Sequence, residues 1–228
     1  EDSPFYVQRE LTEWKRPQLA SNGSVQEYPR RASISSFGAG GANAHLILEE
    51  FLPASDTQPA EQPGAQVIVL SAKNQERLDG YVGSMKGFIE AAMVENVSAG
   101  IPLPSLRDFS YTLQVGRAAL EQRLAIVAGG LEELLDILTQ YQSGEPSVPG
   151  LYQGNVKRDS QHARLLVDGA SGVAFLNAVV NNKELDKLAQ LWTAGIDFDW
   201  RLLHTGGHLQ RLSLPTYPFA RERYWVTD

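Results

Sequence analysis

Four histidines and several acids and hydroxyls are the residues that could act in chemistry. His204 and His208 are four apart, a spacing that on a helix would place two metal ligands on one face. Two glycines between them disfavour a helix, and no third ligand is close by in sequence. We therefore predict loop histidines at both positions. His162 lies in a polar stretch, and we predict a surface position for it.

Acid–base and nucleophilic chemistry are also poorly supported. Asp197 and Asp199 could act as a general acid and base. In an extended segment both would point to the same side, and we expect that side to be solvated. Ser33, Ser35 and Ser36 belong to no nucleophile elbow. The sequence has no cysteine, which excludes a disulfide, a thiolate metal site and a cysteine nucleophile.

The glycine run at residues 38–43 could suggest a dinucleotide site. The third glycine of the fingerprint is replaced by Asn43, and residues 44–48 predict a strand where the pyrophosphate would need a helix N-terminus. A tight turn between strands at residues 32–37 and 44–48 fits better. Such a pair is marginal alone, so we predict a fragment of a larger sheet.

Composition limits the classes of function. The 228 residues are 43% hydrophobic, enough for a buried core. The net charge of −7 and the pI of about 5.2 argue against nucleic acid as a main partner, because phosphate neutralisation needs clustered Lys and Arg. No apolar run approaches the roughly 20 residues of a membrane span, and we expect a cytoplasmic location. Because Glu1 replaces the usual Met, we expect the chain to start inside a longer polypeptide.

Apolar periodicity predicts a small α/β domain in the middle of the chain. Residues 74–94 have apolar side chains at spacings of three and four, which indicates a helix with one buried face. Similar patterns predict strands at residues 67–70, 123–128 and 151–154, and helices at residues 105–115 and 131–141. Three strands with flanking helices fit an independent α/β unit. Two short helices follow at residues 173–180 and 184–193, with Gly195 as the C′ residue of the second.

Two segments have neither the apolar periodicity of a helix nor that of a strand. Residues 53–65 contain three prolines and predict a linker. Residues 212–225 contain two prolines and four aromatic side chains. Exposing that much apolar surface is unfavourable, so we predict an extended tail packed along a groove. The groove could belong to a neighbouring domain or to the α/β domain itself.

Several segments together resemble one family. Residues 35–45, Ser-Ser-Phe-Gly-Ala-Gly-Gly-Ala-Asn-Ala-His, resemble the C-terminal glycine-loop motif of ketosynthases with the thiolase fold. Residues 69–72 resemble the opening strand of the linker domain that trails these ketosynthases. Residues 214–225 resemble the post-linker signature of modular polyketide synthases, and residues 192–200 resemble the segment just before that signature. The matches keep the family order along the chain.

The spacing of these matches implies one type of synthase. Where an acyltransferase is integrated, it lies between the linker domain and the tail signature and carries a Gly-His-Ser-x-Gly motif. Here about 60 residues separate residue 155 from residue 214, too few for such a domain. The chain therefore resembles the type that lacks an integrated acyltransferase and is loaded by a freestanding one.

The resemblance implies an α/β fold in which a partial thiolase-like strand pair precedes a small linker domain. The expected segments are a ketosynthase C-terminal segment at residues 1–52, a linker at 53–65, the α/β linker domain at 66–155, a helical extension at 156–211 and a tail packed on the ketosynthase at 212–228. The expected partners of the chain are the rest of the ketosynthase and the neighbouring domains of the synthase.

The resemblance also implies a structural or docking role. Ketosynthases use a cysteine nucleophile and two histidines, and this chain has neither the cysteine nor those histidine motifs. The linker region would position the ketosynthase and dock a freestanding acyltransferase for loading of an acyl carrier protein. Alternatively, the chain is a fragment of a complete ketosynthase that condenses acyl thioesters. Phosphopantetheine would reside on the separate carrier protein, and no cofactor or metal is expected in this chain.

Two sets of site residues follow from the resemblance. The acyl-pocket loop of the parent ketosynthase would contain Phe37, Gly38, Ala39, Gly40, Gly41 and Asn43. The packing surface of the tail would contain Leu214, Pro215, Tyr217, Phe219, Arg221, Tyr224 and Trp225. The family often has an aromatic residue at the position of Ala39, and a small residue there implies a more open pocket entrance.

Overall fold

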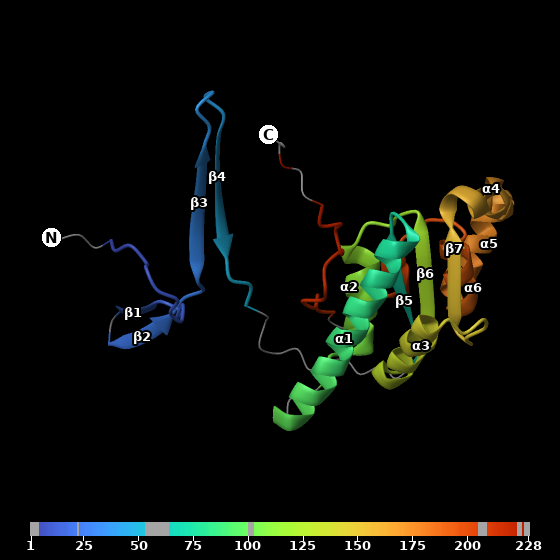
Figure 1. Cartoon of the computed structure of the whole chain (residues 1–228), viewed down its shortest axis with the longest axis horizontal. Coiled ribbons are helices and arrows are strands. Elements are labelled where there is room, and N and C mark those ends of the chain that lie inside the picture. The colour runs from blue at the N-terminus through green and yellow to red at the C-terminus, as the bar shows by residue number, and fades with distance from the viewer. Residues whose placement is uncertain are drawn as a thin grey trace. The chain divides into compact units, whose positions relative to one another are not determined.

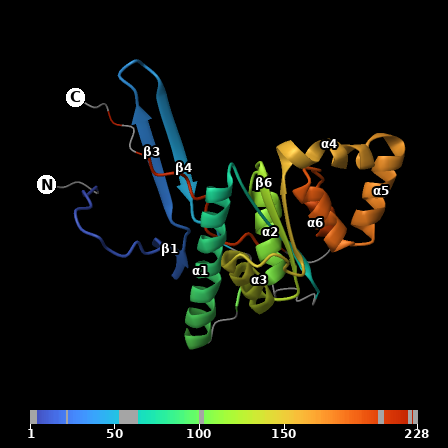
Figure 2. The ribbon, with the colours of Figure 1, turned by 45° about the vertical axis from the view of Figure 1, so that its right-hand side comes forward.

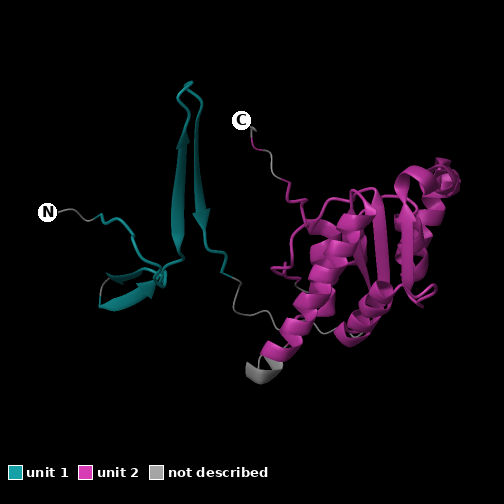
Figure 3. Cartoon of the chain, viewed as in Figure 1, with its two compact units in different colours: residues 1–57 teal, residues 58–228 magenta. Residues whose placement is uncertain are grey.

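The computed structural model describes residues 5–21, 23–52, 64–99, 103–204, 209–222 and 225 of the chain. The chain forms two compact units, Glu1–Thr57 and Gln58–Asp228, which we call unit 1 and unit 2 (Figure 3). The elements in chain order are β1 (Gln18–Ser21), β2 (Ser24–Glu27), β3 (Arg31–Phe37), β4 (Asn43–Glu49), β5 (Gln66–Ala72), α1 (Gln75–Ala99), α2 (Leu106–Gly116), β6 (Gln122–Ala128), α3 (Leu131–Ser143), β7 (Leu151–Asn155), α4 (Val156–Val167), α5 (Gly169–Asn181), α6 (Leu185–Thr193) and the 3-10 helix η1 (Trp200–Leu203) (Figure 1). Most of the predicted linker, residues 53–63, lies outside the described residues.

Unit 1 consists of two antiparallel strand pairs. β3 and β4 pair along their whole length, which confirms the strand pair predicted around the glycine run. β1 and β2 form a second, shorter pair that the sequence patterns did not predict. Every residue of β4 is exposed, including Leu46, Ile47 and Leu48, which alternate between the two faces. The β3–β4 ribbon therefore has apolar side chains on both faces without a covering layer among the described residues.

Unit 2 is built on a three-stranded antiparallel sheet in the order β5-β6-β7. Helices α1 and α3 pack against each other and against the sheet, and α2 and α6 contact it as well (Figures 1 and 2). β5 is buried from Val67 to Ala72, so both of its faces are covered. The predicted α/β fold, with about three strands and flanking helices, is confirmed.

Helix α1 begins where the sequence predicts. The Asn74 side chain accepts a hydrogen bond from the Arg77 amide at 2.9 Å, which satisfies one amide of the first turn. Five apolar residues of the predicted face are buried, namely Leu78, Tyr81, Val82, Met85 and Ile89, and the other two, Phe88 and Ala92, are half-buried. The helix continues to Ala99, beyond the predicted end at residue 94.

The elements after β7 differ in part from the prediction. Helix α4 lies within the expected helical extension at 156–211, but its own range was not predicted, because its sequence is mostly polar and its apolar residues gather near its C-terminal end. Helix α5 starts at Gly169, earlier than the predicted residue 173. The C′ role of Gly195 is confirmed, since it has a φ of +97° and its amide donates to the Trp192 carbonyl at 3.0 Å.

One large buried core and two smaller buried clusters hold unit 2 together. The largest fully buried side chains of the large core are Phe109, Ile68, Leu70, Leu78, Met85, Ile89, Leu113, Leu124, Ile126, Leu134 and Leu138, and Leu188 belongs to a smaller cluster. At the outer edge of β5, the Ser110 hydroxyl and the Gln114 amide of α2 both donate to the Val67 carbonyl, at 2.8 and 2.7 Å. These bonds occupy a sheet edge that could otherwise pair with another strand.

In the described parts of the chain, no single helix is both long and apolar enough to cross a membrane. Helices α4 and α5 pass that test as a pair, but they are bent by 99° at the break between them. The pair lies at the end of unit 2 away from α1 (Figure 2).

We predict that Leu124→Ala destabilises unit 2 by about 2–5 kcal/mol, because it leaves a cavity in a core that cannot fully collapse around it. Thermal or urea unfolding would measure the change. The control is Leu165→Ala, whose side chain is 75% exposed, and its effect should stay within about 0.5 kcal/mol. Equal effects of the two substitutions would contradict the assigned core.

Candidate interaction sites

The glycine run forms the turn between β3 and β4. The Gly38 amide donates to the Ala42 carbonyl at 2.8 Å, and the Gly41 amide donates to the Gly38 carbonyl at 3.0 Å. A Cβ atom on Gly38 would lie 2.8 Å from the Ala42 oxygen, so a side chain there would force the turn to shift. Because strand β4 follows the turn, no helix N-terminus stands there for a pyrophosphate.

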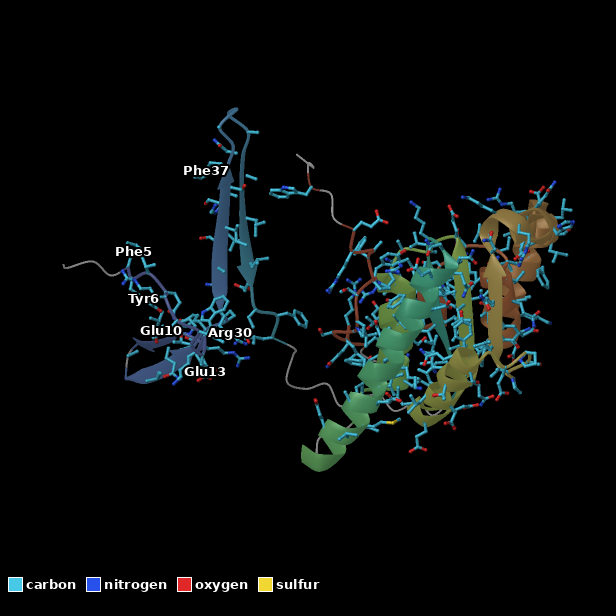
Figure 4. All side chains as sticks on the ribbon, viewed as in Figure 1. Phe5, Tyr6, Glu10, Glu13, Arg30 and Phe37 are labelled. Atoms are coloured by element: carbon cyan, nitrogen blue, oxygen red, sulfur yellow. The ribbon has the colours of Figure 1, made fainter. Side chains whose placement is uncertain are left out.

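The predicted pocket-loop residues surround this turn. Phe37 and Asn43 form the last pair of the ladder, and the Phe37 side chain is 72% exposed (Figure 4). The turn residues 38–41 are exposed as well. One contact was not indicated by the sequence: Ser35 Oγ lies 2.9 Å from His45 Nδ1 on the facing strand. The role of these residues in an acyl pocket stays a prediction.

A cluster of charges at the base of β3 and β4, formed by Arg16, Arg30 and Glu50, joins the segments of unit 1, and we call it the Glu50 clamp. Figure 4 labels Arg30 of this cluster. Arg30 and Arg16 donate to the Glu50 carboxylate at 2.6 and 2.8 Å, and the Arg30 amide donates to it at 3.1 Å. Arg30 also donates to the Trp14 carbonyl at 3.3 Å. Hydrogen bonds from Arg30 and then Arg16 hold the pKa of Glu50 far below its ordinary value of 4.5. The sequence gave no signal for this clamp, because its members are up to 34 residues apart.

The first part of the aromatic tail, residues 209–218, packs on unit 2, and we call it the strap. The amides of Gln210 and Leu212 donate to Asp108 Oδ1 and Thr112 Oγ1 of α2, at 2.8 and 2.9 Å. The strap is thus an extended segment whose backbone is held by side chains of a helix.

The strap then crosses to the start of α1. Arg117 reaches the Pro215 carbonyl at 3.5 Å, and the Lys73 amide donates to the Tyr217 hydroxyl at 3.2 Å. Leu214 is 6% exposed and belongs to the core of unit 2. Leu214, Pro215 and Tyr217 therefore lie on unit 2 itself, one of the two surfaces that the sequence left open.

Beyond the strap, residues 219–222 and Trp225 are exposed. Phe219 and Trp225 are 76% and 77% exposed, and Arg221 is exposed too. Tyr224 lies outside the described residues. Packing of this distal part on a ketosynthase stays a prediction.

A groove of about 1020 Å³ lies between the end of the strap and one end of the sheet. Aromatic side chains of Trp192, Phe198 and Trp200 form part of its wall, with the Phe198 and Trp200 ring centroids 4.4 Å apart. Its charged lining residues are Lys73, Arg77, Arg117, Glu121, Asp197 and Glu222. The described lining has three cations and three carboxylates, so it favours neither a negatively charged nor a positively charged ligand.

The two aspartates have separate structural roles. Asp197 pairs at 2.9 Å with Arg123, whose side chain is 4% exposed. Asp199 instead accepts a hydrogen bond from the Arg201 amide at 3.0 Å and caps η1. Both aspartates are exposed, so the predicted solvated position is confirmed for each, although each also has a structural partner.

Arg123 connects β6 to the end of α6. Its Nη1 donates to the Trp192 carbonyl at 2.8 Å, its Nε donates to the Leu120 carbonyl at 3.1 Å, and its guanidinium lies 4.9 Å from the centre of the Trp192 ring. A buried charge is tolerated only with such partners. The sequence placed Arg123 at the start of a strand but gave no sign that its side chain points inward.

The three histidines that the structure describes lie at separate places: His45 on β4, His162 on α4 and His204 after η1. His204 is half-buried, and its Nε2 lies 2.6 Å from Gln114 Oε1. The amide nitrogen of Gln114 already donates to Val67, so we assign the proton to His204 Nε2. His162 is exposed as predicted, and His208 lies outside the described residues. Within the described ranges, no three His, Cys, Asp or Glu residues are grouped as metal ligands.

Helices α4 and α5 form an exposed apolar surface, which we call the elbow. The elbow residues Leu165, Leu166, Val173 and Phe175 are 75%, 63%, 55% and 40% exposed. A Cβ atom on Gly172 would lie 2.1 Å from the backbone of Val167, so the two helices meet closely at the bend. Helix α5 contains no charged residue, which is unusual for an exposed helix.

These features define a class of protein region. A strand ribbon that lacks its covering layer precedes a small domain with a complete core, an exposed distal tail and an apolar elbow. Such a combination is typical of a linker region that adjoins other domains, because exposed apolar surface on this scale marks sites of interaction.

Comparisons with known proteins give the family. Residues 1–98 match the ketoacyl-synthetase C-terminal extension, and residues 69–145 match the RhiE-like, KS-MAT linker domain. The chain is 40% identical over 230 residues to polyketide synthase PksL of Bacillus subtilis strain 168, with 99% of the chain aligned. It is 33% identical to polyketide synthase ThaG of Burkholderia thailandensis, again over 99% of the chain. It spans only 5% and 4% of these two synthases.

Solved structures of ketosynthases are similar to this chain, in agreement with the sequence comparisons. The ketosynthase from module 6 of the bacillaene synthase of Bacillus subtilis 168 has a TM-score of 0.68 and 33% identity, with 98% of this chain and 35% of that chain covered. The oxazolomycin ketosynthase domain of Streptomyces albus JA3453 has a TM-score of 0.57 and 33% identity, with coverage of 98% and 32%. The chain belongs to the ketosynthase C-terminal extension and trailing linker of trans-acyltransferase polyketide synthases.

We predict that Arg30→Gln raises the pKa of Glu50 toward 4.5, because it removes the largest cause of the depression. Because the pKa of Glu50 is lowered in the folded chain, the intact clamp stabilises the fold fully above pH 4.5, the ordinary pKa of a glutamate. This stabilisation is lost as the pH falls through the lower pKa that Glu50 has in the folded chain. Carbon-detected NMR titration of the Glu50 carboxyl would measure its pKa in the unchanged chain and in Arg30→Gln. The control is Arg31→Gln, since Arg31 pairs with Glu49. A Glu50 pKa near 4.5 in the unchanged chain would contradict the clamp.

We predict that Arg123→Met costs unit 2 about 1–3 kcal/mol of unfolding free energy, because two buried carbonyls lose a charged donor. Asp197→Asn should cost less than about 1 kcal/mol, since Asp197 is 71% exposed and its pairing is screened by water. Urea unfolding of both variants would compare them. A larger loss from Asp197→Asn would show that the surface pair, and not the buried bonds, matters more.

Proposed function

We propose that this chain positions a ketosynthase within its synthase and provides a docking surface for a freestanding acyltransferase. The observation that carries the proposal is the contrast between the two units. The β3–β4 ribbon of unit 1 is exposed on both faces, whereas unit 2 has a complete core. A segment of the first kind needs a partner sheet, and a domain of the second kind can hold its shape beside it.

The proposed partner of unit 1 is the rest of the ketosynthase. The two solved ketosynthases described above each align with 98% of this chain, which supports a continuous polypeptide from ketosynthase to linker. In that arrangement β3 and β4 would join the sheet of the ketosynthase, and Phe37, Ala39 and Asn43 would border its acyl pocket. The Glu50 clamp would fix the extended segment before β1 at the base of the ribbon.

The distal tail would add a second attachment. The strap fixes the tail to unit 2 as far as Pro218, so Phe219 and Trp225 emerge from a defined point. Their exposed rings would pack on the ketosynthase, with Arg221 able to pair with an acid there. Two attachments, one through unit 1 and one through the distal tail, would limit the rotation of unit 2 relative to the ketosynthase.

The elbow is the surface that we assign to docking. It combines four exposed apolar side chains with a helix that has no charge, and the tight contact at Gly172 holds its two helices at a fixed angle. A rigid apolar surface loses little conformational entropy on binding. The freestanding acyltransferase is the partner that the trans-acyltransferase class supplies, and it would load a carrier protein that bears phosphopantetheine.

A second description concerns the parent polypeptide. The chain spans about one third of the solved ketosynthases, which supports an origin within a complete ketosynthase that condenses acyl thioesters with loss of carbon dioxide. In that description the chain contributes the pocket loop to the parent's activity. The two descriptions are compatible, because one concerns the chain and the other the enzyme that contains it.

We predict saturable binding when the purified chain is titrated with the freestanding acyltransferase of the same pathway in a calorimeter. Leu166→Ser and Phe175→Ser should each weaken binding about tenfold, because each removes buried apolar contact worth about 1.5 kcal/mol. Leu202→Ser is the matched control, since Leu202 is 54% exposed on η1 outside the elbow.

Two other outcomes would contradict docking of an acyltransferase at the elbow. Absence of heat and of co-elution at high concentration would remove the docking role and leave unit 2 as a rigid spacer. Sedimentation of the chain alone should be measured in parallel. Self-association that Phe175→Ser abolishes would assign the elbow to a second copy of the chain instead.

A further inference from the structure

Side chains of α2 hold the first half of the strap firmly. The amides of Gln210 and Leu212 donate to Asp108 and Thr112 at 2.8 and 2.9 Å, which are ordinary distances for well-formed hydrogen bonds. The next inward residue, Leu214, is 6% exposed and belongs to the large core of unit 2. The strap is therefore anchored by hydrogen bonds and by a buried side chain as far as Leu214.

The second half of the strap, residues 215–218, makes longer contacts. The Pro215 carbonyl accepts from Arg117 and from the Tyr81 hydroxyl, both at 3.5 Å. The Pro218 carbonyl accepts from Arg77 at 3.4 Å. Hydrogen bonds in proteins usually span about 2.7–3.2 Å, and longer contacts are weaker. The bonding therefore weakens along the strap from α2 toward α1.

Tyr217 makes the shortest of the contacts between this second half and α1. Its hydroxyl accepts from the Lys73 amide at 3.2 Å, and its ring lies edge-on to Tyr81 with the centroids 6.5 Å apart. Pro215, Tyr217 and Pro218 are only half-buried. Tyr217 also lines the groove of about 1020 Å³, so one side of this half faces open space. Lifting residues 215–218 thus uncovers little apolar surface compared with extracting a core side chain.

We propose that the strap is a latch with two positions. In the closed position, which this structure shows, the tail leaves unit 2 at Pro218. In the open position residues 215–218 detach, Leu214 stays in the core, and the tail leaves unit 2 there. Four more residues become free, which extends the reach of the distal tail by about 13–14 Å, because an extended chain spans roughly 3.3–3.6 Å per residue. Glu222 is exposed, so a charge pair at that position adds little to the closed position.

The latch adjusts how tightly unit 2 is held, and this purpose rests on the proposed attachment of the distal tail to the ketosynthase. With the latch closed, the attachment restrains unit 2. With the latch open, unit 2 turns further while the tail stays bound. A surface that binds the tail better in one position shifts the latch toward that position. The latch is measured in the chain alone, so its failure would leave a rigid attachment, and failure of the attachment would leave the latch.

Native-state hydrogen exchange of the full chain tests the latch, because one amide reports each half of the strap. The Lys73 amide donates to Tyr217 and reports the second half, and the Leu212 amide donates to Thr112 and reports the first. We expect the protection factor of Lys73 to be at least about tenfold lower than that of Leu212. Its exchange should not respond to low concentrations of urea, since a local opening exposes little surface. Equal protection of the two amides would mean that the strap moves as one unit and would overturn the proposal.

Gly80→Leu places a wedge under the second half. A Cβ atom on Gly80 would lie 3.8 Å from Pro218 Cγ, so the rest of a leucine side chain displaces the strap. The protection factor of Lys73 should fall at least about tenfold further, and that of Leu212 should not change. Gly87→Leu is the matched control, because Gly87 is also an exposed glycine of α1 and no described atom lies within 4 Å of its Cβ position. Equal effects of the two substitutions on Lys73 would contradict the latch.

An engineered disulfide locks the latch and gives a second test if the wedge variant fails to fold. The chain has no cysteine, so Gly80→Cys/Pro218→Cys introduces a single pair of thiols. The Cβ atoms would lie 3.9 Å apart, within the roughly 3.5–4.5 Å of a disulfide. Oxidation should raise the protection factor of Lys73 at least about tenfold, to that of Leu212, and reduction with dithiothreitol should reverse the gain. Unchanged exchange at Lys73 after oxidation would mean that residues 215–218 do not open on their own and would overturn the proposal.

Discussion

Strands β5 and β6 carry apolar side chains on both faces, and water must be excluded from both faces at once. Helices α1 and α3 and helices α2 and α6 supply that cover. Each fully buried aliphatic or aromatic side chain contributes about 1.5–3 kcal/mol. Two of these covering helices also make specific contacts with the sheet. Helix α2 hydrogen-bonds to the outer edge of β5, and α6 encloses the Arg123 side chain of β6. The strap, the groove and the elbow are all attached to this frame.

Unit 1 shows the opposite condition. Its β3–β4 ribbon has the hydrogen bonds of a sheet, but no layer among the described residues buries its apolar side chains. The Glu50 clamp supplies charge pairing in its place, and exposed charge pairs contribute little to stability. The fold of unit 1 therefore makes physical sense as part of a larger sheet, which agrees with its match to a ketoacyl-synthetase C-terminal extension.

The surfaces of unit 2 differ in charge as well as in shape. The described lining of the groove beside the strap has balanced charges, and the elbow has an uncharged helix. Surfaces of different charge select different partners, because each disfavours a ligand that would leave a charge unpaired. A linker with two such surfaces can hold its neighbours and still leave one surface for a transient partner.

The sequence by itself determined the β3–β4 pair, the turn at Gly38 and the start of α1 at Asn74, because each depends on spacing or sterics within a few residues. It determined the family through several segments that keep their order along the chain. It did not give the range of α4 within the expected helical extension, because this helix is mostly polar. Only the tertiary structure decided that the strap lies on unit 2, that Arg123 points inward and that Glu50 joins two arginines. Those outcomes depend on which distant segments meet, and local patterns do not contain that information.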